Sequence, residues 1–177
     1  HIPGHGRSTS DSHLELPRVT ASEHDLASDF EAFRLVNDAP MAMTAHISYD
    51  AFDAGRAATV SPMMINEVIR GRIGFDGLLM TDDLGMKALG GTLTDRAYAS
   101  IAAGCDMLLH CSGLLKEPAD ILAEMTEVAN ASPHLEGKPL ERARRAEAMS
   151  TRLQDFDLEE GWERFRELVP PDRSAMA

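Results

Sequence analysis

Cysteine is scarce in this chain of 177 residues, which holds only Cys105 and Cys111. Both adjoin apolar segments, and two thiols cannot build the disulfide framework typical of small secreted domains. The Gly- and His-rich residues 1–6 also lack the basic stretch and apolar run of an export signal. Together these absences favour a location in the reducing cytoplasm.

Long apolar runs and an excess of positive charge are absent as well. No apolar run approaches the roughly 20 residues that cross a bilayer, so we expect no contact with the membrane interior. Lys and Arg number 17 against 29 Asp and Glu, which gives a formal net charge of −12. Because such a chain repels a phosphate backbone, nucleic acid is excluded as an expected partner.

The sequence does contain an alternation of short apolar runs and amphipathic segments. The apolar runs at residues 41–46, 77–81 and 106–110 are too short for helices and predict buried strands. Helices are predicted to begin at Ser22, Ser61, Thr94 and Pro118, with one or two more after Pro139. This alternation predicts an α/β fold with a parallel sheet, and the length fits one domain.

The predicted helices carry apolar faces at helical spacing. These faces comprise Leu26, Phe30 and Phe33 in the first helix; Met64, Ile65, Val68 and Ile69 in the second; Ile121, Leu122, Met125, Val128 and Ala129 in the fourth; and Trp162, Phe165 and Val169 near the end of the chain. Such spacing is typical of amphipathic helices.

Reactive side chains stand where the predicted strands end. His46 ends the first strand, Asp82 and Asp83 follow the second, and His110 and Cys111 end the third. In parallel α/β folds this edge of the sheet carries the active site. A charge beside a buried strand needs a partner or a function, which favours a functional role for Asp82. Asp83 points away from its neighbour and is expected to hold a backbone N–H group.

The opening segment, residues 1–13, is rich in histidine and glycine. Asp11 and His13 lie two residues apart, close enough for the carboxylate to bind one ring nitrogen and orient the other, which is the arrangement of an acid/base pair. For His5 and His46 we expect a bracing role. Structural roles are also expected for the histidines that lack an acidic partner in sequence, namely His24, His110 and His134.

Two alternative functions remain open. A metal-dependent barrel hydrolase would gather its ligands from His1, His5, His13, His46 and the aspartates at the strand ends. Against it, the sequence contains neither His-x-His at a strand end nor a His-Glu-x-x-His helix, and we therefore expect no metal. The second alternative is a catalytically inactive fragment that only binds a ligand.

Six blocks in the first 110 or so residues carry a family resemblance. They are residues 1–6 (HIPGHG), 11–17 (DSHLELP), 43–47 (MTAHI), 58–61 (ATVS), 74–84 (GFDGLLMTDDL) and 103–107 (AGCDM). In this order they resemble glycoside hydrolase family 3, and within it the bacterial cytoplasmic β-N-acetylhexosaminidases of peptidoglycan recycling. The segment after Pro118 is similar only loosely.

The resemblance implies a TIM-type (β/α)8 barrel. Such a barrel takes about 250 residues, so residues 1–177 are expected to form a single partial domain of the family's N-terminal type. They would supply the C-terminal βα units and terminal helices, with the N-terminal half of the barrel missing. The chain thus resembles the C-terminal half of the enzyme, and we expect it to be poorly active in isolation.

The resemblance also implies residue roles and a substrate. Asp82 matches the nucleophile, His13 the acid/base and Asp11 the group that orients His13, while His1 matches a sugar-contacting histidine whose usual lysine neighbour is absent. The implied reaction is retaining hydrolysis of terminal β-linked N-acetylglucosamine from muropeptides, without a cofactor. Because a histidine base is not anionic, phosphate could replace water as the acceptor, so phosphorolysis stays open. For the catalytically inactive alternative, the resemblance implies a fragment that binds sugar.

Overall fold

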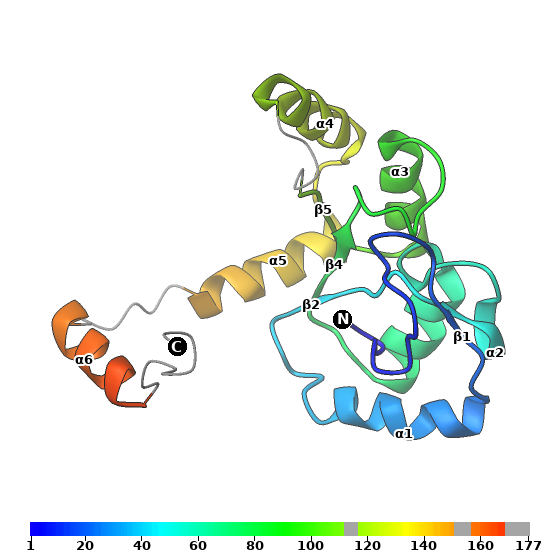
Figure 1. The fold of residues 1–177 in the computed structure, drawn as a ribbon, viewed down its shortest axis with the longest axis horizontal. Helices are drawn as coiled ribbons and strands as arrows, with labels where there is room; N and C mark the ends of the chain where they lie inside the picture. Colours follow the sequence, from blue (N-terminus) through cyan, green and yellow to red (C-terminus); the bar gives the residue numbers. More distant parts are fainter. Residues whose placement is uncertain (112–116, 151–156, 169–177) are drawn as a thin grey trace, which may run out of the picture. The chain divides into compact units, whose positions relative to one another are not determined.

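The computed structural model of the protein describes residues 1–111, 117–150 and 157–168 (Figure 1). Its elements are β1 (Arg18–Val19), α1 (Glu23–Arg34), β2 (Met41–Met43), β3 (Ser48–Tyr49), α2 (Asp50–Asp53), η1 (Ala58–Val60), η2 (Met64–Arg72), β4 (Leu78–Asp83), α3 (Leu93–Ala103), β5 (Met107–Leu109), α4 (Pro118–Ala131), α5 (Gly137–Ser150) and α6 (Leu158–Leu168). The chain divides into two compact units, His1–Ala146 and Glu147–Ala177, which are described separately.

A three-stranded parallel sheet with the order β2-β4-β5 organises the first unit. Ile2 forms a parallel bridge with Thr44, so the opening segment lies beside β2 as a further strand position (Figure 1). These positions follow one another in chain order, with helices between them, which confirms the predicted α/β fold and parallel pairing. β1 and β3 form a separate parallel pair, and the described strands do not close into a barrel.

Strand β4 extends past its predicted end, at the carboxyl edge of the sheet. β4 runs through Asp82 and Asp83, although aspartate is disfavoured in strands and the pattern therefore placed the strand's end before them. The register between β4 and β5 shifts between Met80 and Asp83. There the Leu109 N–H donates to the Thr81 hydroxyl at 2.8 Å, so a side-chain oxygen takes the place of a backbone acceptor. The pairing of β4 with β5 thereby extends to Asp83.

The predicted helices α1, α3 and α4 are confirmed. Ser22 caps α1 by accepting the Asp25 N–H. α3 begins at Leu93, just before the predicted start at Thr94, because Thr92 and Asp95 form a reciprocal capping box. Its end was predicted correctly at Gly104, whose φ of 115° closes the helix in the left-handed region.

The helix predicted from Ser61 is present but wider than an α-helix. Ser61 caps it as expected, since its hydroxyl accepts the Met64 N–H at 3.1 Å. The Ile73 N–H donates at 2.9 Å to the carbonyl of Val68, five residues back, as in a π-helix. The four predicted face residues, Met64, Ile65, Val68 and Ile69, are all fully buried.

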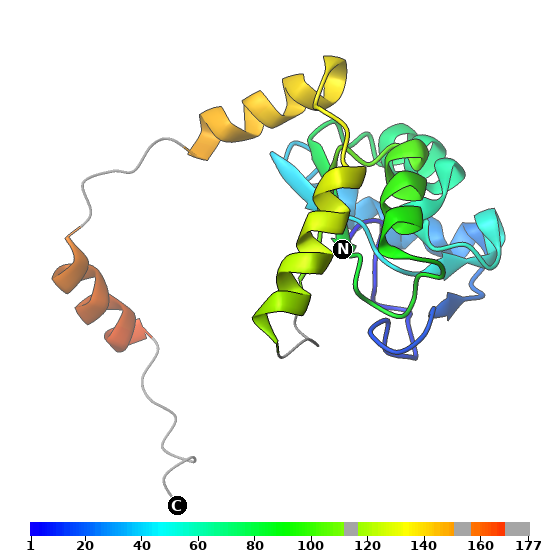
Figure 2. The same ribbon diagram turned by 90° about the horizontal axis from the view of Figure 1, so that it is seen from above.

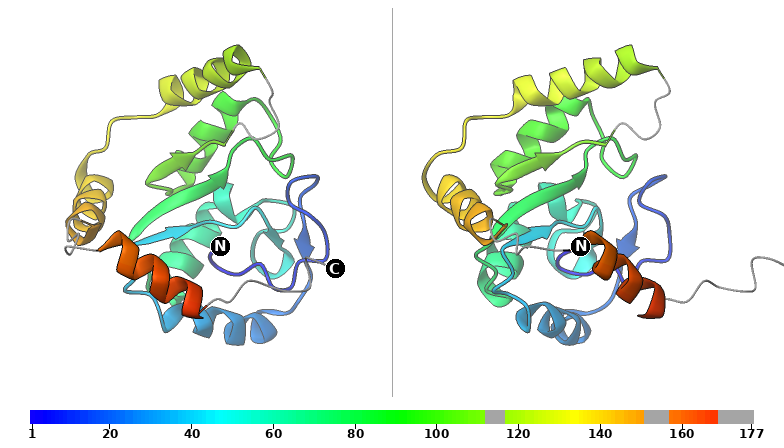
Figure 3. Two further views of the ribbon diagram at one scale, coloured as in Figure 1. Left: turned by 60° about the vertical axis from the view of Figure 1, so that its left-hand side comes forward. Right: turned by 90° about the vertical axis from the view of Figure 1, so that its left-hand side faces the viewer.

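Two apolar clusters form the core of the first unit. The larger packs the face of η2 and the buried face of α1 against the sheet, with Phe30, Ile65 and Leu79 among its members. The smaller joins Leu84 and Ala97 to Val128 and Ala131 of α4. Figures 2 and 3 show α3 and α4 side by side, as this cluster requires.

The predicted apolar stripe of α4 is only partly buried. Val128 is 7% exposed, whereas Leu122 is 66% and Met125 is 53% exposed. The reason is that α4 joins the second cluster through its last turns alone. The helix is thus present as predicted, but Leu122 and Met125 of its apolar stripe are exposed.

A buried ion network fastens α5 to the sheet. Asp106, which precedes β5, accepts hydrogen bonds from Arg70 at 2.7 Å, from Arg142 at 3.0 Å and from the Leu79 N–H at 2.9 Å. The Asp106 side chain is 2% exposed. Asp76 adds a second carboxylate, 2.8 Å from Arg142. This network lies at the amino ends of the strands, opposite the predicted active-site edge.

The second unit contains α6, a helix predicted from its apolar spacing. Trp162 and Phe165 stack with ring centroids 5.4 Å apart, and both are exposed. Val169, predicted to share their face, lies outside the described residues. Among the described helices, none combines the length and apolar character that crossing a bilayer requires.

Candidate active site

The four predicted site residues line one hollow of about 460 Å³. His1, Asp11, His13 and Asp82 all contribute to its walls. The complete lining is His1, His5, Asp11, Ser12, His13, Asp82 and Met86. Residues far apart in the sequence therefore meet at the carboxyl end of β4, the edge at which the strand pattern predicted the chemistry.

Asp82 presents one carboxylate oxygen to this hollow. The residue is 8% exposed, and its Oδ1 accepts the Asp83 N–H at 2.8 Å. Its Oδ2 lies 3.2 Å from Nε2 of His1. One oxygen is thus tied to the backbone of β4, while the other faces the opening segment.

The predicted Asp11–His13 contact is present. Asp11 Oδ1 lies 2.7 Å from Nδ1 of His13 and also accepts the backbone N–H of His13 at 2.9 Å. The carbonyl of His13 accepts the Lys87 N–H at 3.3 Å. This last bond joins the opening segment to the loop that follows β4, which explains why the pair and Asp82 line the same hollow.

The pair shifts the pKa of each partner. The backbone and ring hydrogen bonds from His13 lower the pKa of the Asp11 carboxyl. The hydrogen bond and charge of Asp11 raise the pKa of His13, and the charges of Asp82 and Asp83 add to this. The ring of His13 therefore keeps its second proton to a higher pH than an ordinary histidine and can donate it from Nε2.

Asp83 supports the backbone, as predicted. Its Oδ1 accepts the N–H groups of Gly85 at 2.8 Å and Cys111 at 2.9 Å. The predicted bracing role of His46 is also confirmed, because its Nδ1 lies 2.7 Å from the Thr59 hydroxyl and its Nε2 lies 2.9 Å from the Asp83 carbonyl. These contacts fix the end of β4.

His110 has the hydrogen-bonded structural role that was predicted, and its acidic partner comes from a distant part of the sequence. Its Nε2 lies 2.9 Å from Oε2 of Glu124, and its Nδ1 lies 3.4 Å from Oδ1 of Asp83. Glu124 belongs to α4, so the contact between His110 and Glu124 depends on how that helix packs. Local sequence spacing therefore could not predict it. His5 is more weakly braced, with Nε2 3.4 Å from the Ser12 hydroxyl.

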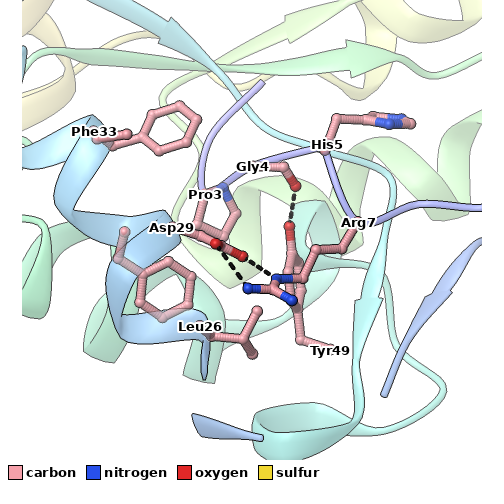
Figure 4. Close-up of a pocket in the computed structure, with 11 residues that line it drawn as sticks. Pro3, Gly4, His5, Arg7, Leu26, Asp29, Phe33 and Tyr49 are labelled. Carbon is pink, nitrogen blue, oxygen red and sulfur yellow. Dashed lines mark hydrogen bonds and ion pairs between the residues drawn. The ribbon is translucent and has the colours of Figure 1, made fainter. Parts of the chain in front are cut away.

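The opening segment is fastened to α1 and β3 on its other side (Figure 4). The Tyr49 hydroxyl donates to the Gly4 carbonyl, and burial raises the pKa of Tyr49 so that it remains a donor. Arg7 forms an ion pair with Asp29 of α1. A second hollow of about 440 Å³ lies here, and Figure 4 shows the ring of His5 turned away from its apolar part.

Candidate metal ligands do not gather in this part of the molecule. Within residues 1–111, 117–150 and 157–168, no three or more His, Cys, Asp or Glu side chains are arranged to hold a metal ion. His1 and His5 lie near each other, with ring centroids 5.8 Å apart, but their rings meet edge to face. The arrangement instead suits proton transfer and nucleophilic attack, because it pairs a carboxylate with an oriented imidazole.

Comparison with protein families gives one match that covers most of the chain. Residues 1–144 match the model described as the glycosyl hydrolase family 3 N terminal domain. This finding corrects the expectation that the chain is the C-terminal half of the enzyme, since the matched region belongs to the family's N-terminal domain.

Curated relatives are named β-hexosaminidase. That of Alkalilimnicola ehrlichii is 47% identical over 117 residues, which cover 63% of this chain and 33% of the relative. The chain thus spans about one third of the length of this relative.

Solved structures of the family share the fold. NagZ from Neisseria gonorrhoeae, in complex with N-trifluoroacetyl-D-glucosamine, is 28% identical with a TM-score of 0.64, covering 86% of this chain and 45% of that one. Zn-bound CbsA from Thermotoga neapolitana is 30% identical with a TM-score of 0.65, covering 86% and 35%. From the matched family model and these relatives, the chain belongs to glycosyl hydrolase family 3.

Proposed function

We propose that this chain carries the catalytic residues of a retaining β-N-acetylhexosaminidase that removes terminal β-linked N-acetylglucosamine from muropeptides in cell-wall recycling. The observation that carries the proposal is the shared hollow, in which the Asp11–His13 pair and Asp82 meet at the carboxyl end of β4. The relatives' name and the glucosamine derivative in complex with NagZ support this substrate class.

In the first step, Asp82 attacks the anomeric carbon of the bound sugar through Oδ2. The bond from that carbon to the leaving oxygen breaks, and His13 transfers the proton on Nε2 to this oxygen. Asp11 stabilises the imidazolium and holds its ring in place. His1, 3.2 Å from Asp82, is suited to contact the sugar beside the reacting carbon.

In the second step, water displaces Asp82. Neutral His13 takes a proton from the water as its oxygen bonds to the anomeric carbon and the bond to Asp82 breaks. Two inversions restore the original configuration. A histidine in place of the usual second carboxylic acid leaves the acceptor site less negative, so phosphate is an alternative acceptor.

The wider setting belongs to the same proposal. The strand positions follow chain order as in a (β/α)8 barrel, of which they would form a part. The expected location is the cytoplasm, and the expected partner is the muropeptide rather than nucleic acid, given the net charge of −12.

The experiment uses an aryl N-acetyl-β-glucosaminide as substrate. Because the chain spans about one third of its relative, we would assay both the chain and a hybrid protein, in which its matching residues replace those of the Alkalilimnicola ehrlichii β-hexosaminidase. We predict that Asp82→Gly lowers kcat of the hybrid at least about 1,000-fold, since the nucleophile is lost.

Asp38→Gly, at an exposed aspartate after α1, is the matched control and should leave turnover unchanged. Equal turnover by wild-type and Asp82→Gly hybrids would contradict the proposal, as would sugar binding without any turnover by the wild-type hybrid. Loss of activity after chelation would favour the metal-dependent alternative. A glycosyl phosphate product would identify phosphate as the acceptor.

A further inference from the structure

Three buried polar side chains form a line that ends at β4. Thr44, His46 and Thr59 are each 0% exposed. The Thr44 hydroxyl lies 2.8 Å from the Thr59 hydroxyl, which lies 2.7 Å from Nδ1 of His46. Nε2 of His46 lies 2.9 Å from the carbonyl oxygen of Asp83. The line therefore ends on the residue next to Asp82.

The direction of these hydrogen bonds follows from the last one. A carbonyl oxygen only accepts, so Nε2 of His46 carries a hydrogen. Burial lowers the pKa of His46, against the opposing effects of the hydrogen bond to Asp83 and of nearby carboxylates. In the neutral ring Nδ1 accepts, so the single hydrogen of the Thr59 hydroxyl is directed at Nδ1, 2.7 Å away, rather than at the more distant Ala45 carbonyl at 3.2 Å. The Thr59 oxygen accepts in turn from Thr44.

Packing alone does not require this line. Its neighbours Ala45 and Ile47 are also 0% exposed and fill their space with apolar groups. A polar side chain buried without a partner costs roughly 1–3 kcal/mol, so His46 is tolerated here because both ring nitrogens are bonded. What the ring adds beyond its volume is one donor, directed at the Asp83 carbonyl.

Asp83 passes this constraint on to Asp82. Its N–H donates to Oδ1 of Asp82 at 2.8 Å. Its own carboxylate accepts the N–H groups of Gly85 and Cys111. The Asp83 backbone therefore holds one oxygen of the Asp82 carboxylate, Oδ1, while the other oxygen contacts His1.

We propose that His46 is a positioning residue, which holds the Asp83 carbonyl, fixes the end of β4 and so directs Oδ2 of Asp82 at the anomeric carbon. It acts through Asp83 and touches neither the substrate nor the reacting atoms. The inference rests on the proposed function and adds to it a residue outside the hollow.

The first test compares His46→Leu with His46→Gln in the hybrid protein. Leu fills the space but removes the donor, whereas the Gln amide can still donate to Asp83. Because misplacement of a reacting group by about 1 Å costs on the order of 100-fold, His46→Leu should lower kcat by roughly 10- to 100-fold with little change in KM. His46→Gln should recover most of this loss. Wild-type kcat in His46→Leu would overturn the inference.

The second test replaces the Asp82 carboxylate by azide. In Asp82→Gly, azide can attack the anomeric carbon in place of the carboxylate while His13 still gives its proton to the leaving oxygen. If His46 acts only through Asp82, adding His46→Leu leaves the azide-dependent rate unchanged within about 2-fold. An equal drop in the azide-dependent rate would show a general structural effect and overturn the inference.

Two further measurements cover the case in which His46→Leu does not fold. Thr59→Val removes the donor to Nδ1 of His46 and should also lower kcat with KM nearly constant; an unchanged kcat would count against the inference. In the 177-residue chain, ¹⁵N NMR should show a neutral His46 ring with its hydrogen on Nε2, and a hydrogen on Nδ1 instead would overturn it. Full turnover in Asp82→Gly would contradict the proposed function instead.

Discussion

His13 shows how much a single neighbour can decide. Its ring is exposed, so burial contributes little to its pKa, and the raised value comes from Asp11, only two residues away. Because the contact is local, the Asp-x-His spacing was enough to predict it. The same carboxylate oxygen also accepts the backbone N–H of His13, which fixes the turn as well as the ring.

Asp11→Asn should move the pH dependence of the reaction to lower pH. The first step needs protonated His13, so kcat/KM falls as pH rises through the pKa of His13 in the free protein. Asp11 raises that pKa above its ordinary value of about 6.5. Without the carboxylate the alkaline limb of kcat/KM in the hybrid should therefore shift to lower pH. Asp38→Asn serves as the control. If the alkaline limb of kcat/KM stays at the same pH in Asp11→Asn, a group other than the Asp11–His13 pair determines that limb.

Single residues also mark where prediction from the sequence failed. That Asp82 and the opening segment lie together could be predicted, because strand ends and histidine-rich loops are visible locally. The partner of His110 could not, since Glu124 reaches it only through the packing of α4. The donor from His46 to the Asp83 carbonyl was equally invisible, because it joins residues 37 positions apart.

Elements were predicted in type more reliably than in extent. Capping residues gave the start of α1 at Ser22 and the end of α3 at Gly104. The end of β4, in contrast, depends on a register shift and a threonine hydroxyl that no periodicity reveals. Burial of a whole helix face depends on what packs against it. For α4 the apolar stripe was read correctly as a helix, but only its last turns join a cluster.

The buried ion pairs around Asp106 should contribute more to the free energy of unfolding of the first unit than its exposed ion pairs do. Removing one partner of a buried ion pair leaves the others uncompensated, which costs roughly 3–5 kcal/mol. Asp106→Ala removes the carboxylate that pairs with Arg70 and Arg142, and it also removes the acceptor of the Leu79 N–H. Urea unfolding, monitored by circular dichroism, should show a free energy of unfolding that is lower by roughly 3–5 kcal/mol in Asp106→Ala than in the wild type.

The matched control is an exposed ion pair, Arg34 with Glu31, in which both side chains are more than half exposed. Exposed ion pairs contribute about 0–1 kcal/mol to the free energy of unfolding, so Glu31→Ala should leave that free energy nearly unchanged. Equal losses in Asp106→Ala and Glu31→Ala would refute a special role for the buried network.

In the first unit, the stabilising ion network and the candidate active site lie at opposite ends of the strands. The Asp106 network lies at the amino ends of the strands, and the hollow with Asp82 lies at the carboxyl end of β4. This polarity follows from parallel strands joined by helices, and it is why the βα pattern predicted both the fold and the edge at which the candidate residues meet. Neither the division into two units nor the second hollow beneath residues 3–7 left a sequence signal.

The central claim is that Asp82 forms the covalent bond to the sugar. Its most direct test incubates the hybrid protein with a fluorinated N-acetylglucosaminyl substrate, whose intermediate is hydrolysed slowly, and identifies the labelled peptide by mass spectrometry. We predict one sugar per protein, attached to Asp82, and no label in Asp82→Gly. A sugar attached to Asp83 or to another carboxylate, or turnover of the normal substrate with inversion at the anomeric carbon, would contradict the claim.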